Sequence, residues 1–313
     1  MVIVSGSLAY DQIMDFPGKF SEHIDPSKIH MLNVSFLVGK MRKGFGGTAG
    51  NIAYTLSLLG VKSAILASAG GDFGLYNDFL EKNEVDTRYI KLINKFDTSA
   101  AFGITDSIDN QIWGFYMGAD TLSDQQSVAD ISEKIDLGIV APQNPRAMLK
   151  FSQEYTQKKI PYLFDPGMQL PWLKDADLKK AFVGAAIIIG NDYEVDVMEK
   201  KTGINDLHTH FQNKIIITTL GREGARISYK GIKSEIKSAI VINTSDPAGA
   251  GDCMRAGFVA GYLRGFIPVV CLKMGAVAAA YTVEKFGTTT HHFTIAEFEK
   301  RYNANYDEEL DLG

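Results

Sequence analysis

Residues 246–252 read DPAGAGD and place a carboxylate directly after a turn of small residues. Glycine adopts positive φ easily and lets another group come close to the main chain. The residues that follow, 252–264, carry Phe258, Val259 and Leu263 at helical spacing. The turn is therefore expected at a helix N-terminus, where unpaired N–H groups attract an anion such as phosphate.

A simpler interpretation of this stretch is an ordinary helix cap, in which Asp252 or Asp246 accepts hydrogen bonds from the first turn. Other phosphate-binding motifs fit the chain poorly. It contains no GxxxxGK[ST] segment, which excludes a P-loop. A relaxed dinucleotide fingerprint occurs at 44–49, but the segment before it, 40–43, is basic and unlike a buried strand. The strand after it ends near Ser68 without the acid that would bind a ribose.

The composition is that of a globular protein with a sizeable core: 313 residues, 45% of them hydrophobic and 22% charged, with a formal net charge of −5. The negative charge disfavours nucleic acid or an anionic membrane as a partner. No apolar run is long enough to span a bilayer, and the apolar start predicts a strand rather than a signal peptide. We therefore expect a cytoplasmic protein. The spacing of the two cysteines indicates neither a disulfide scaffold nor a zinc site, and the pair His291-His292 is not part of a zinc-binding motif.

Short apolar runs alternate with helical patterns along most of the chain, which predicts an α/β fold. Because the strands are apolar throughout, they are expected to be buried on both faces of a central, mostly parallel sheet flanked by helices. The predicted strands are 1–4, 63–67, 137–141, 161–164, 186–189 and 214–219, and the predicted helices are 51–59, 73–82, 193–201 and 252–264.

Two segments, 12–43 and 87–119, break this alternation. The second shows alternating strand patterns with turn signals at 94–95, at Asp106 and at Asp109-Asn110. We expect both segments to form a small β-strand lid inserted in one domain that spans 1–313. An exposed lid edge would favour pairing with a second copy of the chain, and hence a homodimer.

Five segments, in order along the chain, resemble signatures of the ribokinase-like (PfkB) family of sugar and nucleoside kinases. Pro247 departs from the family pattern, which usually has Thr there; it lacks an N–H, so no phosphate contact is expected from it. Within the family, the stretches 16–24, 33–38 and 44–54 resemble bacterial adenosine kinases. The five matching segments are GSLAYD at 6–11, GGTAGN at 46–51, NDYE at 191–194, TLGREG at 219–224 and DPAGAGD at 246–252.

The resemblance implies a ribokinase-like fold and an ATP-dependent kinase that phosphorylates the 5′-hydroxyl of a nucleoside, adenosine first. Asp252 would accept the proton, and the turn Gly249, Ala250 and Gly251 would stabilise the phosphoryl group through the N–H groups of Ala250 and Gly251. Arg255 would neutralise charge or form a surface ion pair. A sugar such as ribose or fructose is the alternative acceptor. A non-catalytic nucleotide-binding module is a third interpretation, which the retained Asp252 disfavours.

The same resemblance implies ATP and Mg²⁺ as cofactors, with a monovalent cation such as K⁺ as a further candidate. Asn191 and Glu194 would face the Mg²⁺–phosphate group, with the metal near Glu194; a plain helix cap is their alternative. Thr219, Gly221 and Gly224 would line the nucleotide, and an ordinary hairpin turn is the alternative for them.

On the acceptor side, the resemblance places Ser7 in the opening motif beside the substrate. Asp11 and Asn51 would hydrogen-bond a vicinal diol. The pair Gly46 and Gly47 would let the sugar approach the backbone. Two aromatic residues of the predicted lid, Phe102 and Phe115, would sandwich a purine, with packing inside the lid as the alternative.

Overall fold

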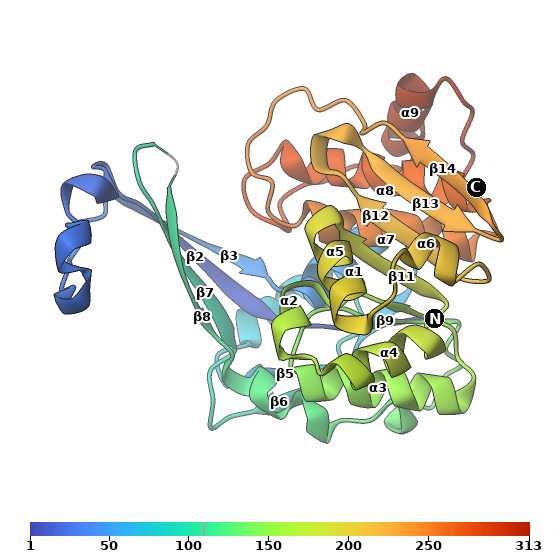
Figure 1. Ribbon diagram of the computed structural model, residues 1–313, viewed down its shortest axis with the longest axis horizontal. Coiled ribbons are helices and arrows are strands. Elements are labelled where there is room, and N and C mark those ends of the chain that lie inside the picture. Colours follow the sequence, from blue (N-terminus) through green and yellow to red (C-terminus); the bar gives the residue numbers. More distant parts are fainter. Residues whose placement is uncertain (109) are drawn as a thin grey trace.

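The computed structural model describes residues 1–108 and 110–313, so Asp109 of the predicted 109–110 turn lies outside the described residues. Its centre is an eight-stranded sheet with the order β14-β13-β12-β11-β10-β9-β1-β4 (Figure 1). Its strands are β1 (Val2–Ser5), β4 (Ser63–Ile65), β9 (Leu137–Val140), β10 (Tyr162–Phe164), β11 (Ile187–Asn191), β12 (Ile215–Thr219), β13 (Ala225–Tyr229) and β14 (Ile232–Ile236).

The sheet is parallel from β4 to β12, and β13 and β14 add an antiparallel edge. This confirms the predicted mostly parallel α/β sheet. The prediction of one strand over 63–67 was wrong, because the chain leaves the main sheet after Ile65. Residues Ala67–Gly70 form β5 and pair with β6 (Ile90–Ile93) in a separate small sheet. On its outer side, the edge strand β4 has only an isolated bridge of Ala64 with Asp86 among the described residues.

Helices cover both faces because successive strand residues point to opposite sides. Val2 and Val4 of β1 pack in the core under α1, α2, α7, α8 and α9, whereas Ile3 packs in the core under α3 to α6. The helices are α1 (Thr48–Leu58), α2 (Gly74–Lys82), α3 (Pro145–Lys158), α4 (Asp175–Gly184), α5 (Asp192–Thr202), α6 (Leu207–His210), α7 (Ala250–Leu263), α8 (Pro268–Val283) and α9 (Ile295–Tyr306). Among the described residues, none of these helices is long and apolar enough to cross a membrane.

A second sheet of four strands, here called the projecting sheet, extends away from this body (Figure 1). Its order is β3-β2-β7-β8, and short 3₁₀ turns at Phe20–Glu22 and Pro26–Met31 lie at its far end. Both segments that break the α/β alternation contribute strands to it. The strands are β2 (Ala9–Asp15), β3 (Lys40–Gly46), β7 (Ser99–Thr105) and β8 (Gln111–Tyr116).

The boundaries of the projecting sheet differ from the predicted 12–43 and 87–119. The sheet begins at Ala9, and the first part of the second segment forms β6 beside the body. The two outer strands are β3 and β8, and every residue of β8 is exposed. A homodimer through these edges stays a prediction.

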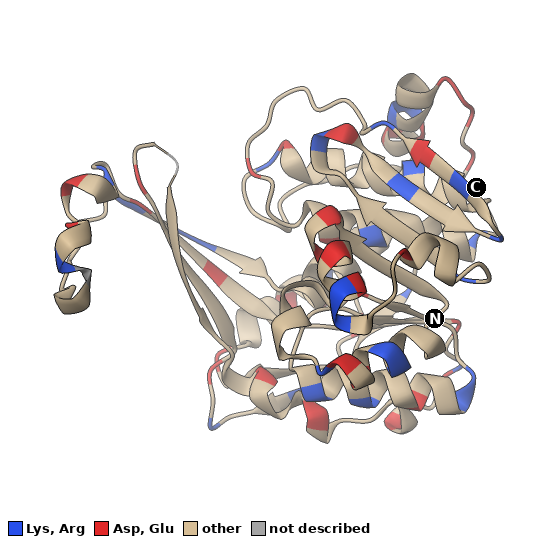
Figure 2. Cartoon of the chain, viewed as in Figure 1, with Lys and Arg blue, Asp and Glu red and all other residues tan. Residues whose placement is uncertain are grey.

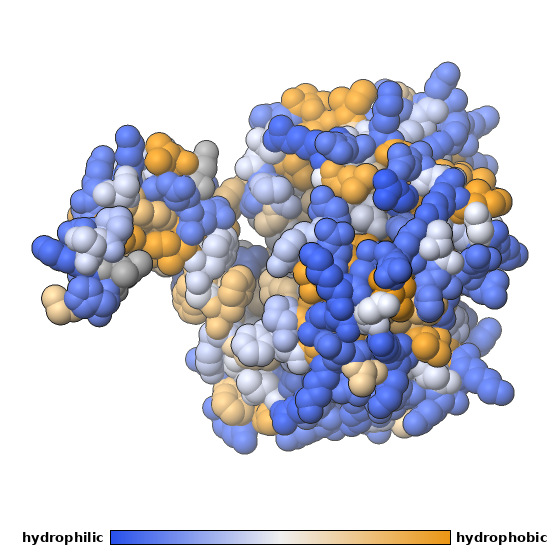
Figure 3. All heavy atoms as spheres, in the orientation of Figure 1, coloured by the Kyte–Doolittle hydropathy of each residue, from blue (hydrophilic) through white to orange (hydrophobic). Residues whose placement is uncertain are grey.

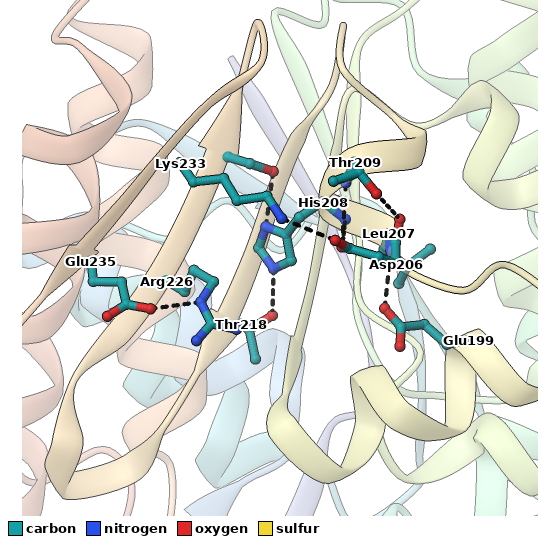
Figure 4. Close-up of polar contacts among 10 residues, drawn as sticks. Glu199, Asp206, Leu207, His208, Thr209, Thr218, Arg226, Lys233 and Glu235 are labelled. Carbon is teal, nitrogen blue, oxygen red and sulfur yellow. Dashed lines mark hydrogen bonds and ion pairs between the residues drawn. The ribbon is translucent and has the colours of Figure 1, made fainter.

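A buried histidine anchors the end of the main sheet that carries β12 and β13 (Figure 4). The two ring nitrogens of His208 lie 2.8 Å from the hydroxyls of Thr218 and Ser228. Ion pairs of Lys233 with Asp206 and of Arg226 with Glu235 flank it. Burial lowers the pKa of His208 to about 4, so the ring is neutral at pH 7. Through its hydrogen bond to Thr218, His208 fixes the end of β12 just before the turn that begins at Thr219.

We predict that His208 makes the fold sensitive to acid. An unfolded histidine titrates near pH 6.5, so the unfolded chain binds more protons as the pH falls from about 6.5 toward 4, and stability declines. Burial also lowers the pKa of His291 to about 4, so the effect must be measured as a difference. Between pH 7 and 5, chemical denaturation of His208→Gln should lose about 1–2 kcal/mol less of the unfolding free energy than the wild type. The exposed His210→Gln is the matched control, and an unchanged pH dependence in His208→Gln would refute the prediction.

Candidate active site

A cavity of about 590 Å³ lies where the projecting sheet meets the carboxyl ends of the parallel strands, the edge at which such folds bind ligands. Figure 3 shows open space between the outer part of the projecting sheet and the body. Both parts contribute to the lining. The body provides Ser7, Gly47, Thr48, Asn51, Gln143 and Asp252, and the projecting sheet provides Asp11, Ala101, Trp113 and Phe115.

The small-residue turn begins α7, as predicted. Gly249 has a φ of 76°, which favours glycine, and a Cβ on it would lie 3.0 Å from Thr288. The N–H of Ala250 donates to the carbonyl of Pro247 at 3.3 Å, so its predicted role as a free anion donor was wrong. No acceptor within the described part of the chain is assigned to the N–H groups of Gly251 and Asp252. These two N–H groups are therefore available to an anion.

Asp252 lies in the first turn of α7 and lines the cavity. Its side chain does not cap the helix; one carboxylate oxygen accepts a hydrogen bond from Asn51 Nδ2 at 2.8 Å. The simple cap interpretation was therefore wrong for Asp252, while Asp246 accepts from the N–H of Ala248 at 2.9 Å. Burial raises the pKa of Asp252 to about 6, although Arg255 and the Asn51 bond act in the opposite direction. The group is thus ionised at pH 7 yet basic enough to take a proton.

Arg255 lies on the same helix as Asp252 and is only 7% exposed. It forms an ion pair with the carboxylate of Asp165, which follows β10 and is 1% exposed. The alternative of a surface ion pair was wrong, because helix α7 is packed into the core at this turn. Gly251 has no side chain to obstruct the guanidinium, since a Cβ there would lie 2.7 Å from Arg255 Nη1. The cation is therefore held against the first turn of α7, beside Gly251.

We predict that this ion pair is needed for stability only as a pair. Arg255→Ala leaves Asp165 charged and buried without its partner, which should lower the unfolding free energy by about 3–5 kcal/mol. The double variant Asp165→Asn/Arg255→Met removes both charges, so Asp252 loses the attraction of Arg255 and the repulsion of Asp165 together, and most of that loss should be recovered. Denaturant unfolding of both variants gives the comparison. A double variant as unstable as Arg255→Ala would contradict the prediction.

Asp11 lies on β2 at the base of the projecting sheet and faces the cavity. Burial, and secondarily the charge of Asp246, raise its pKa to about 6. Gly46 makes room for this carboxylate, because a Cβ there would lie 2.2 Å from Asp11 Oδ2. Gly46 therefore leaves space for Asp11 and does not itself line the cavity. Gly47 has a φ of 84°, which turns the chain, and it also lines the cavity. Ser7 exchanges hydrogen bonds with Thr48 and joins β1 to α1.

The aromatic wall of the cavity comes from β8. Phe115 and Trp113 stack with ring centroids 6.1 Å apart and an interplanar angle of 11°. The prediction that Phe102 sandwiches a base was wrong. Its neighbour Ala101 pairs with Phe115 and lines the cavity, so Phe102 points to the opposite face of the sheet. Trp113 lines the cavity instead, and its spacing of two from Phe115 in a predicted strand could have identified it.

The predicted nucleotide residues lie at the same sheet edge but outside the cavity lining. Asn191 and Glu194 form a capping box at the start of α5, in agreement with the cap alternative. Acidic residues begin α5 and Lys200 and Lys201 end it, which complements the helix dipole (Figure 2). The oxygen Oε2 of Glu194 accepts the N–H of Asn191 at 2.8 Å.

The turn after β12 lies beside this cap, because Thr219 and Asn191 are register partners. Gly221 and Gly224 both have positive φ, and a Cβ on Gly224 would lie 1.9 Å from the carbonyl of Ile236. The hairpin geometry therefore requires Gly224 itself, whatever the turn binds.

Several lining residues were not predicted. Gln143 follows β9 at the carboxyl edge of the sheet, a position that could have suggested it. The loop 286–290 after α8 gave no recognisable signal. It closes the site because Thr288 and Thr289 donate to the carbonyl of Phe45 at 3.0 and 3.3 Å, and because Phe286 lies under the guanidinium of Arg42.

A desolvated carboxylate beside free N–H groups at a helix N-terminus can place a proton acceptor next to a bound phosphoryl group. The family model for pfkB family carbohydrate kinases matches residues 9–294. The nucleoside kinase of Methanothermobacter thermautotrophicus is 32% identical over 279 residues, which cover 88% of this chain and 89% of the relative.

Solved structures agree. A Burkholderia thailandensis nucleoside kinase in complex with inosine superposes with a TM-score of 0.89 at 32% identity and 99% coverage of both chains. A Methanocaldococcus jannaschii nucleoside kinase, an archaeal member of the ribokinase family, superposes with a TM-score of 0.88 at 26% identity, covering 97% of this chain and 98% of that one. The chain therefore belongs to the pfkB family of carbohydrate kinases. It has the ribokinase-like fold and is a kinase whose acceptor is an alcohol.

Proposed function

We propose that the protein transfers the γ-phosphoryl group of ATP to the 5′-hydroxyl of a nucleoside, with adenosine as the first candidate. The observation that carries the proposal is the cavity itself, which has carboxylates at Asp11 and Asp252 and stacked rings at Trp113 and Phe115. A nucleoside has the matching parts: a diol, a primary hydroxyl and a flat base. Relatives named nucleoside kinases, and one solved with ADP and inosine, support it.

In this proposal Asp252 takes the proton of the 5′-hydroxyl as its oxygen bonds to phosphorus and the bond to ADP breaks. The open N–H groups of Gly251 and Asp252 stabilise the charge on the transferring group, assisted by the helix dipole. Asn51 holds the carboxylate through Nδ2. Its buried Oδ1 has no hydrogen-bond partner in the described residues and is therefore free to accept from the substrate.

Mg²⁺ is implied by the reaction, and the residues present fit a metal that arrives with the nucleotide. Within the described parts of the chain, no group of three His, Cys, Asp or Glu side chains could hold a metal alone. Mg²⁺ in such sites keeps waters and binds substrate phosphates, so one or two carboxylates suffice. Asp165 has a buried Oδ1 without a partner in the described chain. Burial is the main cause of the raised pKa of Glu194, and the charge of Asp165 is the second cause. These two groups would hold Mg²⁺ through its waters, and the bound metal would neutralise phosphate charge.

The test is a coupled ADP-release screen of the wild type over adenosine, inosine, other nucleosides, ribose and fructose. We expect turnover with nucleosides, because the free sugars cannot reach the stacked rings. Asp252→Asn keeps the shape of the side chain but removes the proton acceptor, so it should lower kcat by about 10²- to 10⁴-fold and leave ATP binding by calorimetry nearly unchanged. Turnover of ribose or fructose with none on any nucleoside would overturn the acceptor; near-normal turnover of Asp252→Asn would overturn the role of Asp252.

We also predict that Asp11 recognises the ribose diol. An ionised carboxylate only accepts hydrogen bonds, and the 2′- and 3′-hydroxyls offer two donors. Loss of the 2′-hydroxyl should reduce kcat/KM of the wild type by about 10- to 150-fold. Asp11→Ala should discriminate far less between adenosine and 2′-deoxyadenosine. Kinetics of the two enzymes with the two substrates measure this coupling, and equal penalties would show that Asp11 does not contact the 2′-hydroxyl.

A further inference from the structure

Gln143 is an unusual polar residue of the cavity. It lines the cavity but is only 1% exposed. Neither its Oε1 nor its Nε2 has a hydrogen-bond partner in the chain as far as the structure describes it. A buried amide without partners costs free energy, and in native proteins such a group usually binds an ordered water or a ligand.

The backbone around Gln143 is fixed, so the side chain cannot easily turn away from the cavity. The next residue, Asn144, caps α3 and donates its N–H to Asp120 Oδ2 at 2.8 Å. The preceding carbonyl, of Pro142, accepts hydrogen bonds from the Ser7 N–H at 3.1 Å and from Thr48 Oγ1 at 2.9 Å. Both ends of the short connection between β9 and α3 are therefore tied to neighbouring elements.

The other buried polar groups of the cavity already have partners or assigned tasks. Asp120 accepts hydrogen bonds from Ser123 and Asn144, and the partly buried Ser7 and Thr48 bond each other. In the proposed reaction, the carboxylates of Asp11 and Asp252 serve the ribose and the transferred proton. The carboxamide of Gln143 is thus left to recognise the remaining polar part of the acceptor, which is the base.

We infer that Gln143 determines base specificity by binding the edge of a purine that carries a polar group at C6. This inference rests on the proposed nucleoside kinase activity. A carboxamide presents one donor and one acceptor side by side, the pattern with which Gln and Asn bind adenine in pairs of hydrogen bonds. Rotated by half a turn, the same amide donates to a 6-oxo group and accepts from the ring N–H beside it. Gln143 would therefore allow both adenosine and inosine to bind as substrates.

The test compares adenosine, inosine and purine riboside, which has no group at C6, as substrates of the wild type and Gln143→Met. Methionine has a similar length and removes both polar atoms. We expect kcat/KM for adenosine and inosine to fall by about 10- to 100-fold, and that for purine riboside by about threefold or less. The control is Gln157→Met on the exposed side of α3, which should match the wild type with all three nucleosides.

A second measurement separates recognition from a structural role. Because methionine buries no unpaired polar atom, the melting temperature of substrate-free Gln143→Met should equal or exceed that of the wild type. Equal losses on all three nucleosides, no loss on any, or a lower melting temperature would overturn the inference while leaving the nucleoside kinase proposal intact. If the wild type phosphorylates no nucleoside, both fail. Should Gln143→Met not fold, Gln143→Asn, which is one methylene shorter, must show the same substrate pattern for the inference to stand.

Discussion

The site depends on keeping a charged carboxylate, Asp252, in a largely desolvated position at the start of α7. Taking a carboxylate out of water is costly, and Asp11 and Asp165 lie close enough to raise its pKa further. The helix N-terminus, the amide of Asn51 and the cation of Arg255 offset this cost. Asn51 comes from α1, whereas the helix N-terminus and Arg255 both belong to α7, so two distant parts of the sequence together hold this side chain in its ionised form.

The parallel sheet brings these groups together. Each strand ends at the same edge, and the residue that follows it, such as Asp165 after β10 or Gln143 after β9, enters the site without a long loop. The strands can be short because they are buried on both faces by alternating residues. Rigidity at this edge comes from local hydrogen bonds, for example those that Pro142 accepts from Ser7 and Thr48.

Much of this architecture could be predicted from the sequence, because apolar strands and helix periodicity are local signals. The turn at residues 249–251 followed from its local pattern, and the lining by Asp11, Asn51 and Asp252 followed from the resemblance to signatures of the kinase family. Other features depend on pairings that no local pattern encodes. The face to which Phe102 points follows from the register of β7 against β8, and the burial of Arg255 follows from how α7 packs on its neighbours. Likewise, only the three-dimensional structure shows that Gly46 serves Asp11 rather than the ligand.

The division of the cavity between two parts of the molecule has a consequence for ATP. Asp11, Trp113 and Phe115 belong to the projecting sheet, whereas Asn51 and Asp252 belong to the body. Under the proposed function, a bound acceptor contacts both parts, so it joins them when it presents its hydroxyl. A water molecule is too small to do so. The protein would thus distinguish its substrate from water by the length of the molecule that contacts both parts. Hydrolysis of the nucleotide would then be slow while no acceptor is bound.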